Sequence, residues 1–366
     1  MRIIDQYMVR EWLKVFFLTF CVAVALLLLD DLFDNLPDLL RFGASIGQIF
    51  GYYVLLLPSF LPLVTPLAFM LSLVIVLGNA HKYNEITALK AAGLSLLNIT
   101  RSLWGVGFLL CGVLFYANAF WVPSALEASQ DALRRLKLGQ ENEQVLLSKT
   151  PFTYISPDQK TLWVTQSFRA DTNEVFRVHI DQRSEQFQLE FQLMAEEGFF
   201  DETKGYWIFL KGHQTKFDDR GTPSWSAPFE RLEMPTYVKP PAFMEILSIL
   251  PQDLSLWQVE ALFQEVSPAD KETVFRAYAV QYQKIWASPF LVLLVLCLAI
   301  PLSCRGVRIN PMIGVAKCVS CFFLYLVLQQ MGITLAEQGH LPILAGVWLP
   351  ITFMLAVSAK LALSRA

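Results

Sequence analysis

The sequence predicts an α-helical membrane protein with six membrane-spanning helices and an all-β domain inserted between the third and fourth helices. Three observations lead to this fold class. Hydrophobic residues make up 54% of the 366 residues and charged residues only 17%, and the mean hydropathy is +0.43, which is unusual for a soluble domain. Long segments without charge recur toward both ends of the chain. The middle of the chain instead alternates apolar and polar residues, as a half-buried β-sheet does.

Spans are expected where about 20 residues pass without a charged side chain. The first, residues 15–29, is followed by aspartates and by no small-residue cleavage site, so we expect a retained anchor rather than a signal peptide. Residues 42–80 carry no charge. We expect an interfacial helix at residues 46–57. It bends at three prolines into a second span that ends near Leu77. The prolines form either a simple kink in the helix or a break that binds substrate. The prolines are Pro58, Pro62 and Pro66, and the other four spans are expected at residues 102–126, 285–304, 318–336 and 341–359.

Arginine and lysine residues predict the orientation of these spans. In a six-span arrangement the basic residues beside the spans gather on one side, which the positive-inside rule makes cytoplasmic. They are Arg2, Arg10, Lys14, Lys82, Lys90, Arg101, Arg305, Arg308, Lys360 and Arg365. Both termini are then cytoplasmic, whereas the acidic residues 30–40 and the β domain lie on the outer side.

The middle of the chain, about residues 144–237, has the period of two that is typical of β-strands, with turn formers between the alternating segments. This pattern predicts an antiparallel sandwich or an open roll with one apolar face. Its aromatic residues, among them Phe187, Phe191 and Trp207, suit either a packed core or a conduit for an apolar ligand. Residues 243–284 return to helix, with a helix start at Ser267 and Pro268. The expected divisions of the chain are residues 1–126, 127–245 and 246–366.

Motifs of the common enzyme classes are missing or misplaced. The sequence has no phosphate-binding loop and no H-E-x-x-H motif, and its four histidines are scattered. Residues 43–47 match G-x-S-x-G, but the strand and histidine that a nucleophile elbow requires are not predicted there. Cys318 and Cys321 have metal-like spacing within an apolar helix, where core packing is the better interpretation. We therefore expect no catalytic site, metal, cofactor or nucleic-acid partner.

A polar interruption between two apolar segments, residues 79–101, predicts a short cytoplasmic helix. Glu85 is expected to begin it, Ile86 and Leu89 with Ala92 to form its apolar and small face, and Gly93 to end it. Such a helix suits a membrane protein that receives force from a soluble motor. Glu85 is either a solvated acid favoured by the helix dipole or a charged contact to a partner.

Other polar residues lie close to the predicted membrane boundaries. Asp30 and Asp31 close the first span at the outer interface, and Arg41 is placed to meet phosphate headgroups. Lys317 begins the fifth span and either snorkels to the cytoplasmic surface or lines a cavity. Gln329 and Gln330 lie in the outer half of that span, and one of these amides is expected to face protein rather than lipid.

The order of these features resembles the LptF/LptG permeases, the membrane subunits of the lipopolysaccharide export ABC transporter. The resemblance covers essentially the whole chain. It rests on three spans, a β domain and three more spans, with E-I-T-A-L-K-A-A-G at residues 85–93. It also includes Asp5-Gln6-Tyr7 with Arg10, the Pro58–Pro66 segment, Ala195 and Trp207 in the β domain, and LPILAGVWLP at residues 341–350. Residues 329–350 are more similar to the G type than to the F type.

The resemblance implies a non-catalytic permease subunit in the bacterial inner membrane, paired with a second permease of the same family and carried by a cytoplasmic ATPase dimer. It implies that the periplasmic β domain is a jellyroll that passes lipopolysaccharide, or a related glycolipid, to a bridge protein with a matching jellyroll. The alternative is a membrane scaffold whose β domain binds another envelope protein.

The resemblance also assigns roles to particular residues. Lys82, Glu85, Leu89 and Gly93 would couple the permease to the ATPase, with Glu85 facing a basic residue of that partner. Spans one and five would form lateral gates with the partner, and the residues assigned to the lipid path are Asp30, Asp31, Arg41, Lys317, Gln329 and Gln330. Phe187, Phe191 and Trp207 would line the conduit of the β domain. In one respect the sequence departs from the family, because acids (Asp30, Asp31 and Asp34) stand where G-type members often carry lysines.

Overall fold

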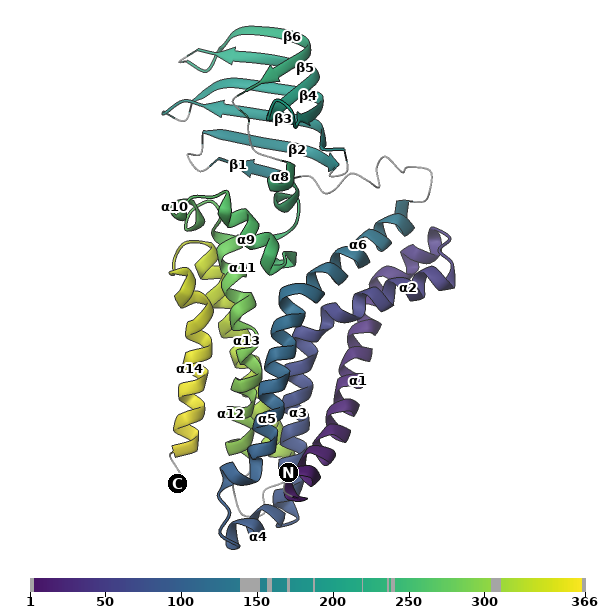
Figure 1. The fold of residues 1–366 in the computed structure, drawn as a ribbon, viewed down its shortest axis with the longest axis vertical. Coiled ribbons are helices and arrows are strands. Elements are labelled where there is room, and N and C mark those ends of the chain that lie inside the picture. The colour runs from purple at the N-terminus through teal and green to yellow at the C-terminus, as the bar shows by residue number, and fades with distance from the viewer. Residues whose placement is uncertain are drawn as a thin grey trace. The chain divides into compact units, whose positions relative to one another are not determined.

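A computed structural model describes most of the chain, namely residues 3–138, 152–156, 160–169, 172–186, 188–218, 220–235, 237, 241–303 and 311–363. The chain divides into two compact units. The first, here the helical unit, comprises Met1–Leu133 and Val280–Ala366, and the second, the sheet unit, comprises Arg134–Ala279 (Figure 1).

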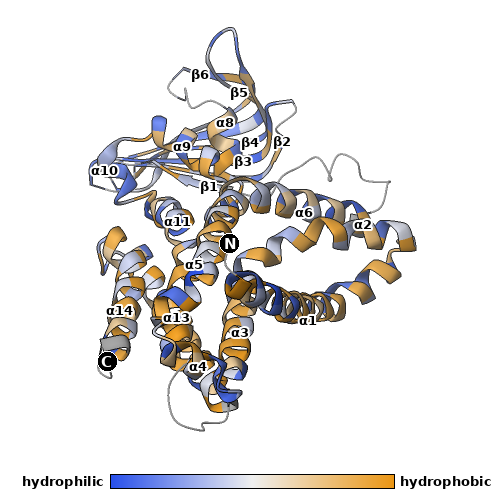
Figure 2. Cartoon of the chain, turned by 60° about the horizontal axis from the view of Figure 1, so that its bottom comes forward, coloured by the Kyte–Doolittle hydropathy of each residue, from blue (hydrophilic) through white to orange (hydrophobic). Residues whose placement is uncertain are grey.

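Long apolar helices build the helical unit. In chain order the elements are α1 (Ile3–Arg41), α2 (Ile46–Leu56), the 3₁₀ turn η1 (Leu57–Phe60), α3 (Leu61–Lys82), α4 (Glu85–Ala91), α5 (Leu96–Tyr116), the π-helical turn η2 (Ala117–Trp121), α6 (Val122–Leu138), α11 (Arg276–Ala287), α12 (Phe290–Ser303), α13 (Pro311–Glu337) and α14 (Ile343–Leu363). Within the described residues five helical stretches are long and apolar enough to cross a membrane, and α11 with α12, bent by 50°, makes a sixth if the pair is one span. In Figure 2, α1 and α3 carry the hydrophobic colour over most of their length.

Two expectations about the first spans meet different outcomes. α1 is 39 residues long and continues well beyond the charge-free residues 15–29, because charged side chains end an apolar segment without ending a helix. The bend after α2 lies where it was predicted, since Pro58 is near the start of η1 and Pro62 near the start of α3.

Ser45, the serine of the G-x-S-x-G match, caps α2 and donates a hydrogen bond to Gln48 Oε1 at 2.9 Å. This serine is therefore a helix cap.

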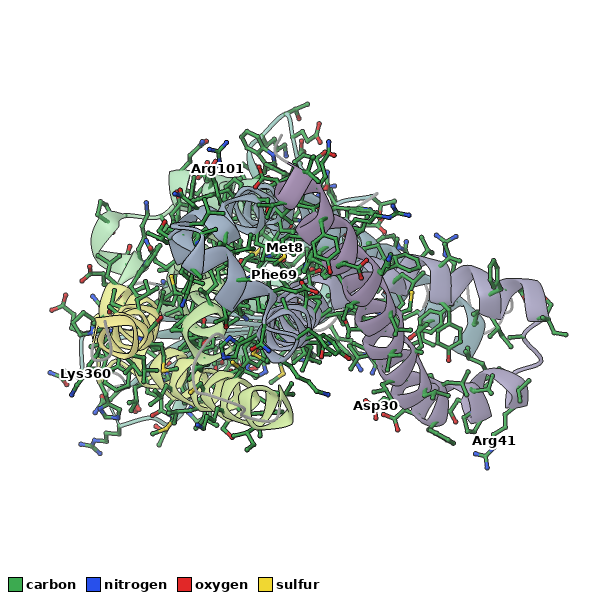
Figure 3. The ribbon with its side chains drawn as sticks, turned by 90° about the horizontal axis from the view of Figure 1, so that it is seen from below. Met8, Asp30, Arg41, Phe69, Arg101 and Lys360 are labelled. Carbon is green, nitrogen blue, oxygen red and sulfur yellow. The ribbon has the colours of Figure 1, made fainter. Side chains whose placement is uncertain are left out.

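The core of the helical unit lies around α3 and α12. Phe69, Leu73 and Leu77 of α3 are fully buried, as are Val292 and Leu296 of α12. Figure 3 shows Met8 and Phe69 among the packed helices, whereas Asp30 and Arg41 lie along α1 away from them. The unit thus has a packed centre, and much of α1 lies at its margin.

Gly332 on α13 and Gly346 on α14 allow these two helices to approach closely. A Cβ atom at residue 346 would lie 2.5 Å from both Gly332 O and Ala336 Cβ, far inside contact distance. We therefore expect Gly346→Ala to destabilise the chain by about 1–3 kcal/mol, the usual cost of overpacking. Gly112→Ala is the matched control, because a Cβ there meets nothing within 4 Å and alanine favours a helix. Thermal melting in detergent should show a lower midpoint for the first variant alone; equal midpoints would contradict the close approach.

The sheet unit contains one antiparallel sheet in which each strand pairs with the next along the chain. Its strands are β1 (Phe152–Ile155), β2 (Thr161–Arg169), β3 (Glu174–Arg183), β4 (Leu189–Asp201), β5 (Tyr206–Phe217) and β6 (Pro223–Met234). Buried aromatic and aliphatic side chains line one face, as the alternation predicted, and among them are Trp163, Ile180, Leu193, Trp207 and Phe209. Of the two arrangements that the sequence left open, the described residues form a single sheet.

Short helices after the sheet contribute to the same core. They are α8 (Pro241–Leu247), the 3₁₀ turn η4 (Pro251–Asp253), α9 (Leu256–Gln264) and α10 (Pro268–Lys271). Phe243 and Met244 of α8 and Leu262 of α9 belong to the apolar cluster of the sheet. This packing explains why the sheet unit extends to Ala279. The predicted helix start at Ser267 is confirmed, because its Oγ donates to Asp270 Oδ2 at 2.7 Å and α10 begins at Pro268.

Candidate functional site

The short helix α4 has the limits that the sequence predicts. It begins at Glu85, after Asn84 in the left-handed conformation (φ 61°). It ends at Ala91, and Gly93 follows with φ +85°, where a residue with a side chain would be strained. Gly93 N donates to Lys90 O at 2.9 Å and Leu94 N to Leu89 O at 3.1 Å, which pairs carbonyls at the helix end. Gly93 therefore fixes the end of α4.

One apolar face fastens α4 to the helical unit. Ile86 is 1% exposed and belongs to the same buried cluster as Met8 and Trp12 of α1, and Leu89 packs against that cluster. Ala92, which was expected on this face, is exposed, because α4 has already ended at Ala91. The opposite face, with Thr87, Ala88 and Lys90, is exposed. α4 is thus held from one side and presents a polar surface on the other.

Glu85 has a partner within the chain that the sequence did not indicate. Its side chain is half-buried, and both carboxylate oxygens lie 3.3 Å from Tyr7 Oη, which donates to them from α1. Tyr7 appeared in the sequence only as part of an N-terminal motif, and no local pattern connects residues that are 78 positions apart. Lys82 is exposed, with its Nζ 5.7 Å from the centre of the Tyr83 ring.

The long apolar part of α1 packs within the chain along one face, where Val15 and Phe16 lie against the buried cluster and Thr19 Oγ donates to Ala68 O of α3 at 3.3 Å. In α1, whose residues are all described, the buried side chains are Asp5, Met8, Trp12 and Leu39. Between Trp12 and Leu39 a series of large apolar side chains is exposed. This series, here the α1 stripe, consists of Leu13, Phe17, Leu18, Val22, Leu26, Leu29 and Phe33. A stripe of this length faces lipid or another membrane protein.

At the far end of α1, the two predicted acids have different surroundings. Asp31 accepts hydrogen bonds from Tyr52 Oη of α2 at 3.1 and 3.2 Å and from Asn35 Nδ2 at 3.0 Å. Asp30 and Arg41 are exposed. Asp31 therefore ties α1 to α2, whereas Asp30 and Arg41, together with Asp34, are exposed charges at this end of α1.

The polar residues of α13 also separate into inward and outward groups. Gln329 Nε2 donates to Val347 O of α14 at 3.3 Å, whereas Gln330 is exposed. The expectation that one amide faces protein is thus confirmed for Gln329. Lys317 is exposed near the start of α13.

The aromatic residues proposed for a conduit lie at different depths. Trp207 is fully buried, and its ring centre is 5.9 Å from that of Trp163 and 5.5 Å from that of Phe200. Phe191 is partly buried at the margin of the same cluster, and Phe187 lies outside the described residues. Burial raises the pKa of Tyr237, which packs on Trp163, to about 12. The interior is therefore apolar and packed, and Phe191 rather than Trp207 reaches its margin.

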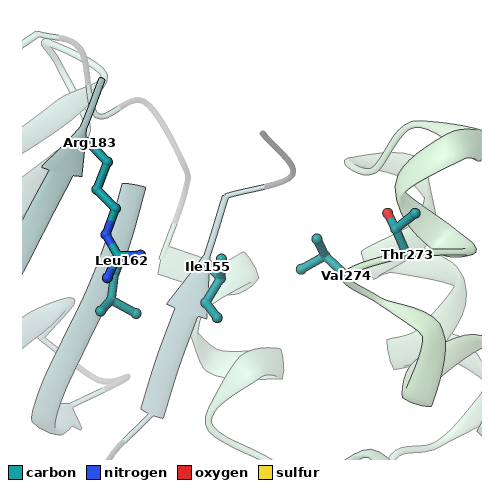
Figure 4. A pocket seen from close by; sticks show the side chains of 5 residues that line it. All are labelled: Ile155, Leu162, Arg183, Thr273 and Val274. Atoms are coloured by element: carbon teal, nitrogen blue, oxygen red, sulfur yellow. The ribbon is translucent and has the colours of Figure 1, made fainter. Parts of the chain in front are cut away.

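A pocket of about 500 Å³ opens at the β1 end of the sheet unit and is lined by Ile155, Leu162, Arg183, Thr273 and Val274 (Figure 4). Ile155 and Leu162 alternate with the buried Tyr154 and Trp163, whereas Val274 packs against the aromatic cluster, so this pocket lies at the β1 edge of the sheet. Its residues include no pair suited to acid–base or nucleophilic chemistry. Among the described residues no group of three or more histidines, cysteines or acids could hold a metal ion.

The chain matches a known family over nearly its full length. The matching family model is described as lipopolysaccharide export system permease LptF/LptG, a description that takes both types together, and it covers residues 6–364. No curated protein matches the chain. The matched residues include the apolar helices, α4 and the sheet, which agrees with a multi-pass inner-membrane component of lipopolysaccharide transport. The chain therefore belongs to the LptF/LptG family of lipopolysaccharide export permeases.

Proposed function

We propose that this chain is the non-catalytic permease subunit of an ABC transporter that extracts lipopolysaccharide, or a related glycolipid, from the inner membrane. The observation that carries the proposal is α4. A helix held by Ile86 on one side and polar on the other can transmit a push to the helical unit without unfolding. In a lipid export permease, the source of such a push is a cytoplasmic ATPase dimer.

The proposed contact with the ATPase comprises Lys82, Glu85, Leu89 and Gly93. Glu85 supplies the charge that meets a basic residue of the ATPase, Lys82 extends the polar surface, Leu89 anchors the helix, and Gly93 sets the angle at which the chain leaves it. This assignment requires α4 and both termini to be cytoplasmic and the sheet unit to be periplasmic, which the distribution of basic residues supports.

The α1 stripe is the proposed contact with a second permease of the same family. Its exposed apolar side chains suit a lateral gate that α1 forms with the fifth span of the partner. The fifth span of this chain, α13, forms the equivalent gate with the first span of the partner. Asp30 and Arg41 face the headgroup region of that gate, and Lys317, Gln329 and Gln330 belong to its α13 side. Asp31 holds the end of α1 in place.

The sheet unit is the proposed exit, a jellyroll-like domain that receives the lipid and passes it to a periplasmic bridge with a matching jellyroll. β6 supports this role, because within the described residues it pairs only with β5 and offers a free edge for a strand from a partner. Phe191 and Phe187 are placed in the conduit, with Trp207 as its packed wall. The segments 1–126, 127–245 and 246–366 then serve as entry, exit and second membrane half, in a chain of the G type.

The orientation can be tested by labelling single cysteines in a cysteine-free background. Thr87→Cys is on the exposed face of α4, and Thr222→Cys is on the exposed turn before β6. We expect a membrane-impermeant maleimide to label residue 87 in inverted vesicles and residue 222 in right-side-out vesicles. Labelling of residue 87 from the periplasmic side would refute the coupling role.

The main alternative is a membrane scaffold whose sheet unit binds another envelope protein. Co-purification of an ATPase distinguishes the two functions in a single inexpensive experiment. A transporter subunit co-purifies with an ATPase that hydrolyses ATP in the complex, whereas a scaffold does not. We expect affinity purification of the tagged chain from its native membrane to retain an ATPase through mild detergent.

A further inference from the structure

The start of α1 and the coupling helix α4 are joined by a hydrogen bond as well as by apolar packing. Tyr7 Oη lies 3.3 Å from both Oε1 and Oε2 of Glu85. A hydrogen bond to a carboxylate is stronger than one between neutral groups. Both side chains are partly exposed, so the bond lies at the surface where a cytoplasmic partner would meet α4.

Apolar packing surrounds this bond on the inner side. Ile86, the neighbour of Glu85, is buried in the cluster that contains Met8, the neighbour of Tyr7. Trp12, one turn further along α1, packs on Phe69 of α3 with ring centres 5.7 Å apart. The first turns of α1, the start of α4 and the middle of α3 therefore form one packed group.

Beyond Trp12, one face of α1 stays packed, because Val15 and Phe16 lie against the same cluster and Thr19 Oγ donates to Ala68 O of α3 at 3.3 Å. The next buried side chain of α1 is Leu39, and the α1 stripe between Trp12 and Leu39 is exposed. α1 is thus packed along one face and presents the α1 stripe on the rest of its surface, so a displacement of its first turns moves the stripe with them. Ile86 and Leu89 hold the inner face of α4 by apolar packing, and the bond from Tyr7 to Glu85 ties the start of α4 directly to α1.

We propose that Tyr7 is a positioning residue that makes α4 and the start of α1 move as one body. It directs the Glu85 carboxylate toward the ATPase and transmits the displacement of α4 to the α1 stripe. This inference rests on the proposed function, because it requires an ATPase that acts on α4.

Tyr7→Phe tests the proposal, because it removes one oxygen and keeps the ring. In the complex of the chain with its partner permease and ATPase, reconstituted in proteoliposomes, we expect ATP hydrolysis to stay within two-fold of the parent rate. We expect the lipid released per ATP hydrolysed to fall at least five-fold. Tyr116→Phe is the control, since it removes an exposed hydroxyl from the end of α5 and should leave both quantities unchanged.

A double-mutant cycle separates positioning from a general structural role. If Tyr7 acts through Glu85, then Tyr7→Phe combined with Glu85→Gln lowers the lipid-to-ATP ratio no further than Glu85→Gln alone. Additive losses, or a normal ratio for Tyr7→Phe in a parent complex that couples, would overturn the role of Tyr7 and leave the proposed function standing. A parent complex that binds no ATPase would overturn the proposed function and this inference with it.

Discussion

Glu85→Lys is expected to abolish coupling between ATP hydrolysis and lipid release while the chain remains folded. The proposed partner of Glu85 is a basic residue of the ATPase, so the change replaces an attraction with a repulsion. Loss of a desolvated charge pair at an interface costs about 2–5 kcal/mol, which corresponds to a loss of coupling of about 30-fold or more.

The cost of Glu85→Lys within the chain is smaller. A lysine at a helix N-terminus is unfavourable by about 0.3–1 kcal/mol, and the lost hydrogen bond from Tyr7, which is long at 3.3 Å and partly exposed, adds about 0.5–1.5 kcal/mol. Ile86 remains buried, so α4 stays attached. The decisive measurement is lipid release per ATP in the reconstituted complex, with Glu337→Lys, an exposed acid at the end of α13, as the control. Export at the parent rate by Glu85→Lys would show that the coupling assignment is wrong.

Local signals explain why α4 was predictable from the sequence. Its start at Glu85 and its end before Gly93 depend on neighbouring residues alone, and the structure confirms both. The strands were predictable for the same reason, since alternation identifies which side chains share a face. The length of α1 was not, because Asp30 and Asp31 end the apolar segment without ending the helix.

Contacts between distant segments could not be predicted in this way. Nothing in the sequence near Tyr7 indicates Glu85, and nothing near Asp31 indicates Tyr52, because each pair forms only when separate helices pack. Periodicity also places Phe191 and Trp207 on one face without giving their depth. The sheet core also includes residues of α8 and α9, and these helices lie outside the alternating segment.

Trp207→Ala is expected to unfold the sheet unit, because this side chain is fully buried between Trp163 and Phe200. Truncation of a buried tryptophan costs about 3–5 kcal/mol, a large part of the roughly 5–15 kcal/mol that stabilises a typical domain. Trp225→Ala is the matched control, since Trp225 on β6 is 45% exposed. Limited proteolysis of the full chain in detergent should show rapid cleavage within residues 152–237 for the first variant alone. Equal resistance of the two variants would contradict the core position of Trp207.

The depth of Trp207 also decides how the conduit is to be tested. A photo-crosslinker in place of Trp207 would disrupt the core, so a failure to capture lipid there would carry no information about the conduit. Phe191 is partly buried at the margin of the cluster and tolerates replacement better. A crosslinker at residue 191 should capture lipid in the energised complex, whereas one at residue 225, on the exposed Trp225, should not. Capture of protein neighbours alone at residue 191 would favour a sheet unit that serves as a spacer rather than as a path for lipid.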